Sequence, residues 1–126
     1  MFATDVTNIT HVRVGARGEN PRQVKFAAVN HAKHATTKTA IVAAVAGKKI
    51  RVLSMNLAGS AADGTATFYS ATTAISGLIP VDIDAIQPMM GLVSEHGIME
   101  TAAGEALQVL TDANMDLDGM ISYVEV

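Results

Sequence analysis

The chain has 126 residues and a mass of 13.1 kDa, the size of one ordinary domain that can bury a hydrophobic core without metals or disulfides. It contains no cysteine, which excludes disulfide cross-links, thiolate catalysis and the usual structural zinc sites. No segment reaches the ~18 consecutive apolar residues of a membrane span, and the N-terminus lacks the pattern of a signal peptide. We therefore expect a soluble protein made in the cytoplasm, with no membrane partner.

The net charge of −3 hides an uneven distribution along the chain. Residues 1–38 carry six basic side chains against two carboxylates, a net charge of +4, whereas residues 39–126 carry three against ten, a net charge of −7. This division predicts a basic N-terminal arm over residues 1–38 that docks on an acidic partner or on a sister subunit. The candidate binding residues of the arm are Arg13, Arg17, Arg22, Lys25, Lys33 and Lys38. They are scattered singly and lack interleaved aromatic residues, which argues against nucleic acid as the partner.

The arm contains two stretches with strand character. Alternating β-branched residues predict a strand over residues 5–14, and a second short strand is expected over residues 24–29. A loop with two glycines and a proline separates them over residues 15–22, and residues 30–39 form a polar connection without periodicity. The arm could therefore contribute a strand to the domain that follows.

Residues 39–126 read as a succession of short β-elements, and the first two differ in pattern. Residues 40–46 form a continuous apolar run, which is typical of a strand buried on both faces. Residues 48–57 alternate, and this pattern places Ile50 and Val52 on one face of a strand and Leu53, Met55 and Leu57 on the other.

The next elements are bounded by turn residues. The small and polar residues 59–64 predict a turn, and residues 65–70 predict a strand with Ala66 and Phe68 on one face. Pro80 interrupts residues 78–86 and indicates an edge strand or a bend. Residues 87–97 are expected to be a connection with one short strand. Residues 100–106 are the one helix candidate, but Gly104 weakens a helix by about 1 kcal/mol, so we prefer a turn before a strand over residues 106–111.

The closing segment, residues 112–126, can be read in two ways. Counting Asn114 as position one of a calcium loop places Asp116 and Asp118 at positions three and five and Glu125 at position twelve, the spacing of an EF-hand. The same residues alternate between apolar and acidic, which is the period of a half-buried strand. An EF-hand also needs a helix after its loop, and the chain ends one residue after Glu125. We therefore predict a strand with an acidic ladder over residues 112–118, and keep Asn114, Asp116 and Asp118 as weak metal candidates.

About eight short strands with hardly any helix predict an all-β fold, an antiparallel β-sandwich or jelly roll with an N-terminal arm. The expected division is an arm over residues 1–38 and a sandwich domain over residues 39–126.

Signals for catalysis are sparse, and we expect neither enzyme activity nor a cofactor. The sequence lacks a nucleophile elbow, a phosphate-binding loop and a dinucleotide fingerprint. His31 and His34 resemble a two-ligand metal clip, but such a site needs a third ligand and Lys33 between them would repel a cation. The seven methionines are expected to fill gaps in a core that is poor in aromatic residues.

Four phrases of the chain resemble a recurrent β-domain of tailed-bacteriophage virion proteins. The phrases are AIVAAVAGKKIRVLS (40–54), ATFYS (66–70), ETAAGEAL (100–107) and GMISYVEV (119–126). The resemblance covers residues 39–126 and implies a small sandwich of the kind found in head decoration (cement) proteins and fibre-like proteins. It leaves out residues 1–38 and does not account for the acidic ladder. In decoration proteins an N-terminal arm commonly pins the subunit to the capsid or its neighbours, often in a trimer.

The resemblance implies a capsid decoration protein that binds the major capsid protein on the outside of the phage head and stabilises it as a homotrimer. The expected location is the capsid surface of the virion. The first alternative is a fibre or tail module that binds host receptors, although only Tyr69 and Tyr123 could stack on sugars. The second alternative is a calcium-binding module built on the acidic closing segment.

Overall fold

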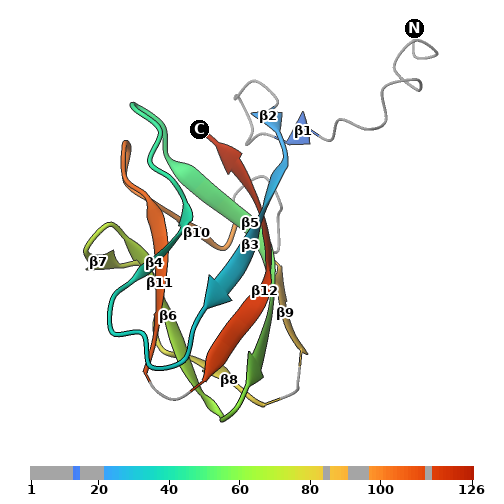
Figure 1. The fold of residues 1–126 in the computed structure, drawn as a ribbon. Coiled ribbons are helices and arrows are strands. Elements are labelled where there is room, and N and C mark those ends of the chain that lie inside the picture. The colour runs from blue at the N-terminus through green and yellow to red at the C-terminus, as the bar shows by residue number, and fades with distance from the viewer. Residues whose placement is uncertain (1–12, 15–21, 84–85, 91–96, 113–114) are drawn as a thin grey trace, which may run out of the picture.

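The structure is a computed structural model that describes residues 13–14, 22–83, 86–90, 97–112 and 115–126. These residues form an all-β protein in which two antiparallel sheets pack face to face (Figure 1). The predicted fold class, an antiparallel β-sandwich, is therefore confirmed. The described residues contain no helix, and hence none that could cross a membrane.

The strands divide into two sheets and one isolated pair. The first sheet contains β3 (Lys25–His31), β5 (Ile50–Ser60), β9 (Ile86–Met90), β10 (Met99–Glu100) and β12 (Asp116–Glu125). Its order is β10-β5-β12-β3, with β9 also pairing β5. The second sheet contains β4 (Thr39–Val42), β6 (Gly64–Ser70), β7 (Thr73–Ala74), β8 (Ile79–Val81) and β11 (Leu107–Thr111). Its order is β4-β11-β6-β7, with β8 also pairing β6, while β1 (Arg13–Val14) pairs with β2 (Arg22–Gln23).

The core lies between the inner faces of the two sheets. Phe68 of β6 is its largest fully buried side chain, and the rest is aliphatic or sulfur-containing, as the composition predicts. The main contributors from the first sheet are Val29, Ile50, Val52, Met55, Leu57, Leu117 and Ile121, and those from the second are Val42, Ala66, Phe68, Val81, Leu107 and Val109. Each residue of this kind contributes roughly 1.5–3 kcal/mol when its side chain leaves water.

The long strand β5 corrects one sequence prediction. Alternation alone places Ile50 and Val52 on the face opposite to Met55 and Leu57, yet all four side chains lie in one core cluster. The reason is an irregularity in the pairing with β12, where Ser54 opposes Ser122 and Val52 opposes Tyr123, so that Leu53 has no opposite residue. A β-bulge of this kind inserts one residue and reverses the alternation beyond it.

Two predicted strands turn out to be edge elements. The apolar run over residues 40–46 is not buried on both faces: β4 ends at Val42, and Ala40 is exposed. Among the described strands β4 pairs with β11 alone, so its outer edge has no covering strand. The prediction for Pro80 is confirmed, because it lies in the three-residue strand β8 at the edge of the second sheet. An edge position tolerates the missing N–H of proline.

Several of the remaining elements lie where the sequence predicts them, whereas β7 and β10 were not predicted. Of the helix candidate over residues 100–106, Glu100 ends β10 and the turn at residues 103–104 replaces a helix, and β6, β9 and β11 lie where strands were expected. The closing segment is a ten-residue strand, β12, which pairs with β3 on one side and with β5 on the other. Of the strand predicted over residues 5–14, the structure describes Arg13 and Val14, and the loop predicted over residues 15–22 lies outside the described residues except for Arg22.

The predicted boundary at residue 38 falls between β3 and β4. Residues 25–31 form β3, which pairs with β12 along its whole length and contributes the buried Val29 and His31. The described part of residues 1–38 thus supplies one strand of the sandwich.

Candidate binding surface

The outer face of the first sheet carries three rows of side chains across β3, β12 and β5. The strand pairings align Phe26 with Ser122 and Ser54 in the first row, Ala28 with Met120 and Asn56 in the second, and Asn30 with Asp118 and Ala58 in the third. We call these nine residues the outer face. The backbone of β9 continues it beyond β5.

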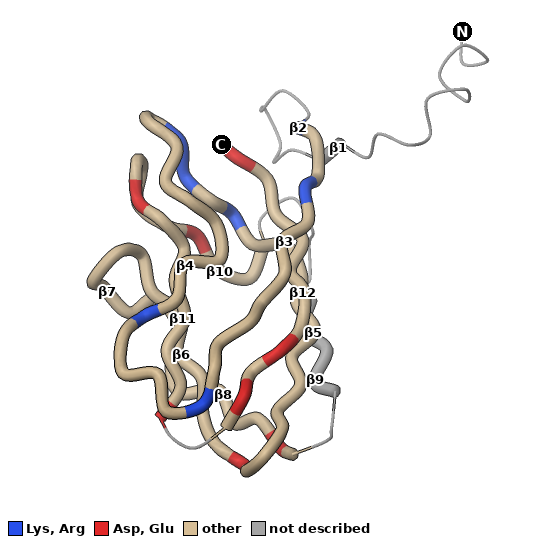
Figure 2. Tube along the Cα trace, viewed as in Figure 1, with Lys and Arg blue, Asp and Glu red and all other residues tan. Residues whose placement is uncertain are grey.

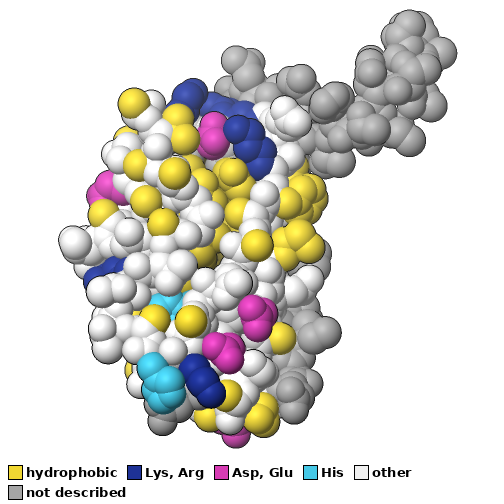
Figure 3. Space-filling model, in the orientation of Figure 1, with side chains coloured by type: hydrophobic (Ala, Val, Ile, Leu, Met, Phe, Trp, Pro, Cys, Tyr) yellow, Lys and Arg dark blue, Asp and Glu magenta, His cyan; other side chains and the backbone are white. Residues whose placement is uncertain are grey.

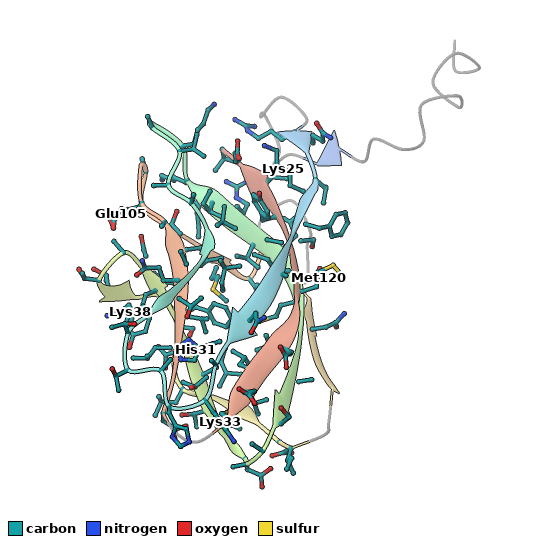
Figure 4. All side chains as sticks on the ribbon, viewed as in Figure 1. Lys25, His31, Lys33, Lys38, Glu105 and Met120 are labelled. Atoms are coloured by element: carbon teal, nitrogen blue, oxygen red, sulfur yellow. The ribbon has the colours of Figure 1, made fainter. Side chains whose placement is uncertain are left out.

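The centre of the outer face is apolar and open to solvent. Phe26 is 67% exposed and Met120 is 50% exposed, and Ala28 between them is exposed as well. Figure 4 shows Met120 pointing away from the body of the sandwich, whereas His31 points into it. Exposed apolar side chains that lie next to one another, and not singly, make this part of the surface a candidate binding site.

A shallow hollow of about 350 Å³ lies next to Met120 on this face. It is lined by Asn56, Leu57, Ala58, Asp118, Gly119 and Met120. Gly119 is required where β12 passes β5, because a Cβ at this position would lie 1.9 Å from the carbonyl oxygen of Asn56. The absence of a side chain at Gly119 brings the two backbones close together and leaves room for the hollow.

The acidic ladder borders the outer face at one end. Asp118 is exposed and has no bonding partner among the described residues, whereas Asp116 accepts a hydrogen bond of 2.8 Å from the backbone N–H of Lys33. Both residues belong to the central strand β12 and not to a loop. Within the described part of the chain, no group of three or more His, Asp or Glu side chains could hold a metal ion, and Asn114 lies outside that part.

The basic residues predicted for the arm lie in three places. Arg22 in β2 and Lys25 in β3 stand near one end of the first sheet, and the hydrogen bond of 3.0 Å to Glu125 raises the pKa of the Lys25 ammonium. Lys33 and Lys38 lie in the connection between β3 and β4, where the Lys38 Nζ sits 4.5 Å from the ring centroid of Tyr69. Arg13 belongs to the short strand β1, and Arg17 lies outside the described residues.

Folding gathers charged residues at the two opposite ends of the sandwich (Figure 2). At the end where β5 begins and β12 finishes, five basic residues face three carboxylates, a net charge of +2; they are Arg22, Lys25, Lys48, Lys49 and Arg51 with Glu100, Glu105 and Glu125. At the opposite end, five carboxylates stand with one lysine, a net charge of −4; they are Asp63, Asp82, Asp112, Asp116 and Asp118 with Lys33. We call these the basic end and the acidic end. Ion pairs within the basic end join Glu100 to Lys49 at 3.5 Å and to Arg51 at 2.7 Å.

The described histidines do not form the two-ligand clip. His31 is fully buried, and its Nδ1 shares a hydrogen bond of 2.7 Å with the Thr39 hydroxyl, whereas His34 is exposed. The Nε2 atom of His31 is buried without a hydrogen-bond partner. His11 and His96 lie outside the described residues.

Sequence reasoning missed the two residues that dominate the outer face. Phe26 lies in a predicted strand but was not expected to be exposed, and Met120 was expected to fill a gap in the core as Met55 and Met115 do. A signal for Met120 was present, because it shares the parity of Asp116 and Asp118 in the closing strand. For Phe26 the sequence offers no signal, since residues 24–29 are apolar on both parities except for Lys25.

Comparison with known proteins adds no assignment. No protein-family model matches the chain, and no curated protein matches it.

Proposed function

We propose that the protein is a structural component of a virion, a capsid decoration protein that binds the outside of a tailed-phage head through contacts with the major capsid protein. It reinforces the head without catalysis, and on the head it forms a homotrimer, as the resemblance of residues 39–126 implies. It is made in the host cytoplasm and located on the capsid surface.

The observation that carries the proposal is the gathering of basic residues at one end of the sandwich. The sequence separates the basic residues 1–38 from Lys48, Lys49 and Arg51, but folding places Arg22 and Lys25 at the same end as these three. A basic end continuous with a basic N-terminal segment gives long-range attraction to an acidic protein surface and orients the approach. Figure 3 shows Lys and Arg side chains collected at the top of the molecule.

The alternative of a carbohydrate-binding fibre module receives less support from the same residues. Sugar sites usually stack a ring on an exposed aromatic face. Lys38 lies over the ring of Tyr69, and Tyr123 is partly buried against the core. Phe26 offers an exposed ring, but it has no polar group of its own with which to orient a sugar.

Co-sedimentation tests the proposal directly. The purified protein is mixed with undecorated tailed-phage heads and centrifuged, and we expect it to pellet with the heads at low salt and less so as salt rises. Recovery of all the protein in the supernatant at every salt concentration would rule out head binding.

A pair of matched variants locates the contact. The double change Arg13→Gln/Arg17→Gln is expected to weaken head binding by about tenfold or more, since each lost cation removes part of the attraction. Lys33→Gln/Lys38→Gln alters the net charge equally but lies in the connection between β3 and β4, away from the basic end, and serves as the control for a general charge effect. Equal losses in both variants would assign the attraction to net charge and not to Arg13 and Arg17.

A further inference from the structure

The outer face of the first sheet combines an apolar centre with two ends of opposite charge. Phe26, Ala28 and Met120 form the centre, Asp116 and Asp118 border it towards the acidic end, and Lys25 stands beside it towards the basic end. We propose that this face pairs with the same face of a second copy of the chain, in an antiparallel two-fold contact centred on Met120.

The two-fold arrangement follows from the distribution of charge. When two identical sheets stack face to face about an axis through Met120, the acidic end of each copy meets the basic end of the other. Asp116 and Asp118 of one copy then approach Lys25 of the other, and the apolar centres meet at the same time. A parallel stacking would instead place acidic end on acidic end. The face is therefore complementary to itself in one orientation.

Three polar side chains of the face bear on its burial. The hydroxyl groups of Ser54 and Ser122 lie 2.5 Å apart and hydrogen-bond to each other, so they are not left without a partner when water is removed. Asp118 is the one carboxylate of the outer face and has no bonding partner among the described residues, which leaves it available to a cation of the second copy. The hollow beside Met120 gives an incoming side chain a place to pack.

The size of the face sets the strength of the contact. β3 pairs with β12 over seven residues, which span roughly 23 Å, and the three strands of the outer face span roughly 14 Å, which gives a flat area of roughly 300 Å². A standard interface buries about 800 Å² of accessible surface on each partner. Because the outer face is smaller than that, we expect the free protein to form a weak, reversible dimer with a dissociation constant in the high micromolar range, whereas the homotrimer of the proposed function forms on the head.

The first test measures association in solution with matched variants. Sedimentation velocity of the full chain, from low to high micromolar concentration, is expected to show a shift from 13.1 kDa towards twice that mass. The double change Phe26→Ser/Met120→Ser is expected to weaken the dimer by about tenfold or more. Leu78→Ser is the control, because Leu78 is 72% exposed but lies between β7 and β8 of the other sheet. Circular dichroism verifies that all variants remain folded.

The second test does not depend on loss of binding. The chain has no cysteine, so Met120→Cys introduces a single thiol, which lies near its counterpart across the two-fold axis. Mild oxidation is expected to yield a disulfide-linked dimer at concentrations where Leu78→Cys stays monomeric. Equal cross-linking of both variants would overturn the proposal.

The remaining outcomes separate this proposal from the proposed function. A wild-type chain that stays monomeric at high micromolar concentration, or a trimer that Phe26→Ser/Met120→Ser leaves intact, would overturn the face-to-face pair. Head binding is measured in a different assay and with the arm variants. A negative result in the association assay therefore does not contradict head binding, and a negative result in the head-binding assay does not contradict the dimer.

Discussion

At the scale of single residues, Thr101 fixes the beginning of β5. It is 3% exposed, its hydroxyl accepts a hydrogen bond of 2.9 Å from the Ile50 N–H, and its own N–H donates to the Ile50 carbonyl. We predict that Thr101→Ala lowers the free energy of unfolding by about 1–3 kcal/mol, because the buried Ile50 N–H loses its acceptor. Urea denaturation measures the change, with the exposed Thr73→Ala as the control. A loss equal to that of the control would show that the hydroxyl is dispensable.

Asp112 gives a pH-dependent contribution at the same scale. The Thr65 N–H donates a hydrogen bond of 2.8 Å to its carboxylate, and this bond holds the pKa of Asp112 below its ordinary value of 3.8. A lowered pKa in the folded state stabilises the protein above pH 3.8, and the stabilisation is lost as the pH falls through the folded-state pKa. The unfolding midpoint of Asp112→Asn should therefore lie below that of wild type at pH 6 and converge with it in acid. A pH-independent difference would contradict this assignment, and Asp82→Asn provides the comparison.

At the scale of elements, the packing of β12 against β5 depends on Gly119. A Cβ at Gly119 would lie 1.9 Å from the Asn56 carbonyl oxygen, a backbone atom that moves only if the strand moves. We predict that Gly119→Ala lowers the free energy of unfolding by about 2 kcal/mol or more. Gly77→Ala is the matched control, since a Cβ there meets no atom within 4 Å. Equal thermal denaturation midpoints for the two variants would show that β12 and β5 accommodate the added Cβ with little loss of stability.

At the scale of the whole molecule, β3 makes part of the predicted arm inseparable from the sandwich. Deletion of residues 1–31 removes β3 with the buried Val29 and His31, and it also uncovers one edge of β12. We predict that this truncation prevents cooperative unfolding, as measured by circular dichroism during heating. Deletion of residues 1–21 leaves β2 to β12 in place and is the version suited to test the arm in head binding. A cooperative transition without residues 1–31 would contradict the role assigned to β3.

The outer face also belongs to this scale, because it combines residues that are distant in sequence. Phe26 and Met120 come from opposite ends of the chain and meet when β3 pairs with β12. Likewise, the basic end joins Arg22 and Lys25 to Lys48 and Lys49, which the sequence separates by the whole of β3 and β4. Neither grouping can be read from local periodicity, since periodicity reports which residues share a face of one strand and not which strands are neighbours.

The sequence by itself determined the fold class, the positions of most strands and the nature of the closing segment. These properties depend on short-range patterns: alternation of period two, turn residues and small aliphatic side chains. Tertiary structure alone decided three other properties: the bulge at Leu53 that brings residues from both halves of β5 into one core, the edge position of β4, and the exposed centre at Phe26 and Met120. These depend on pairing between distant strands. The same alternation fits a central strand, an edge strand and either face of a sheet until its neighbours are in place.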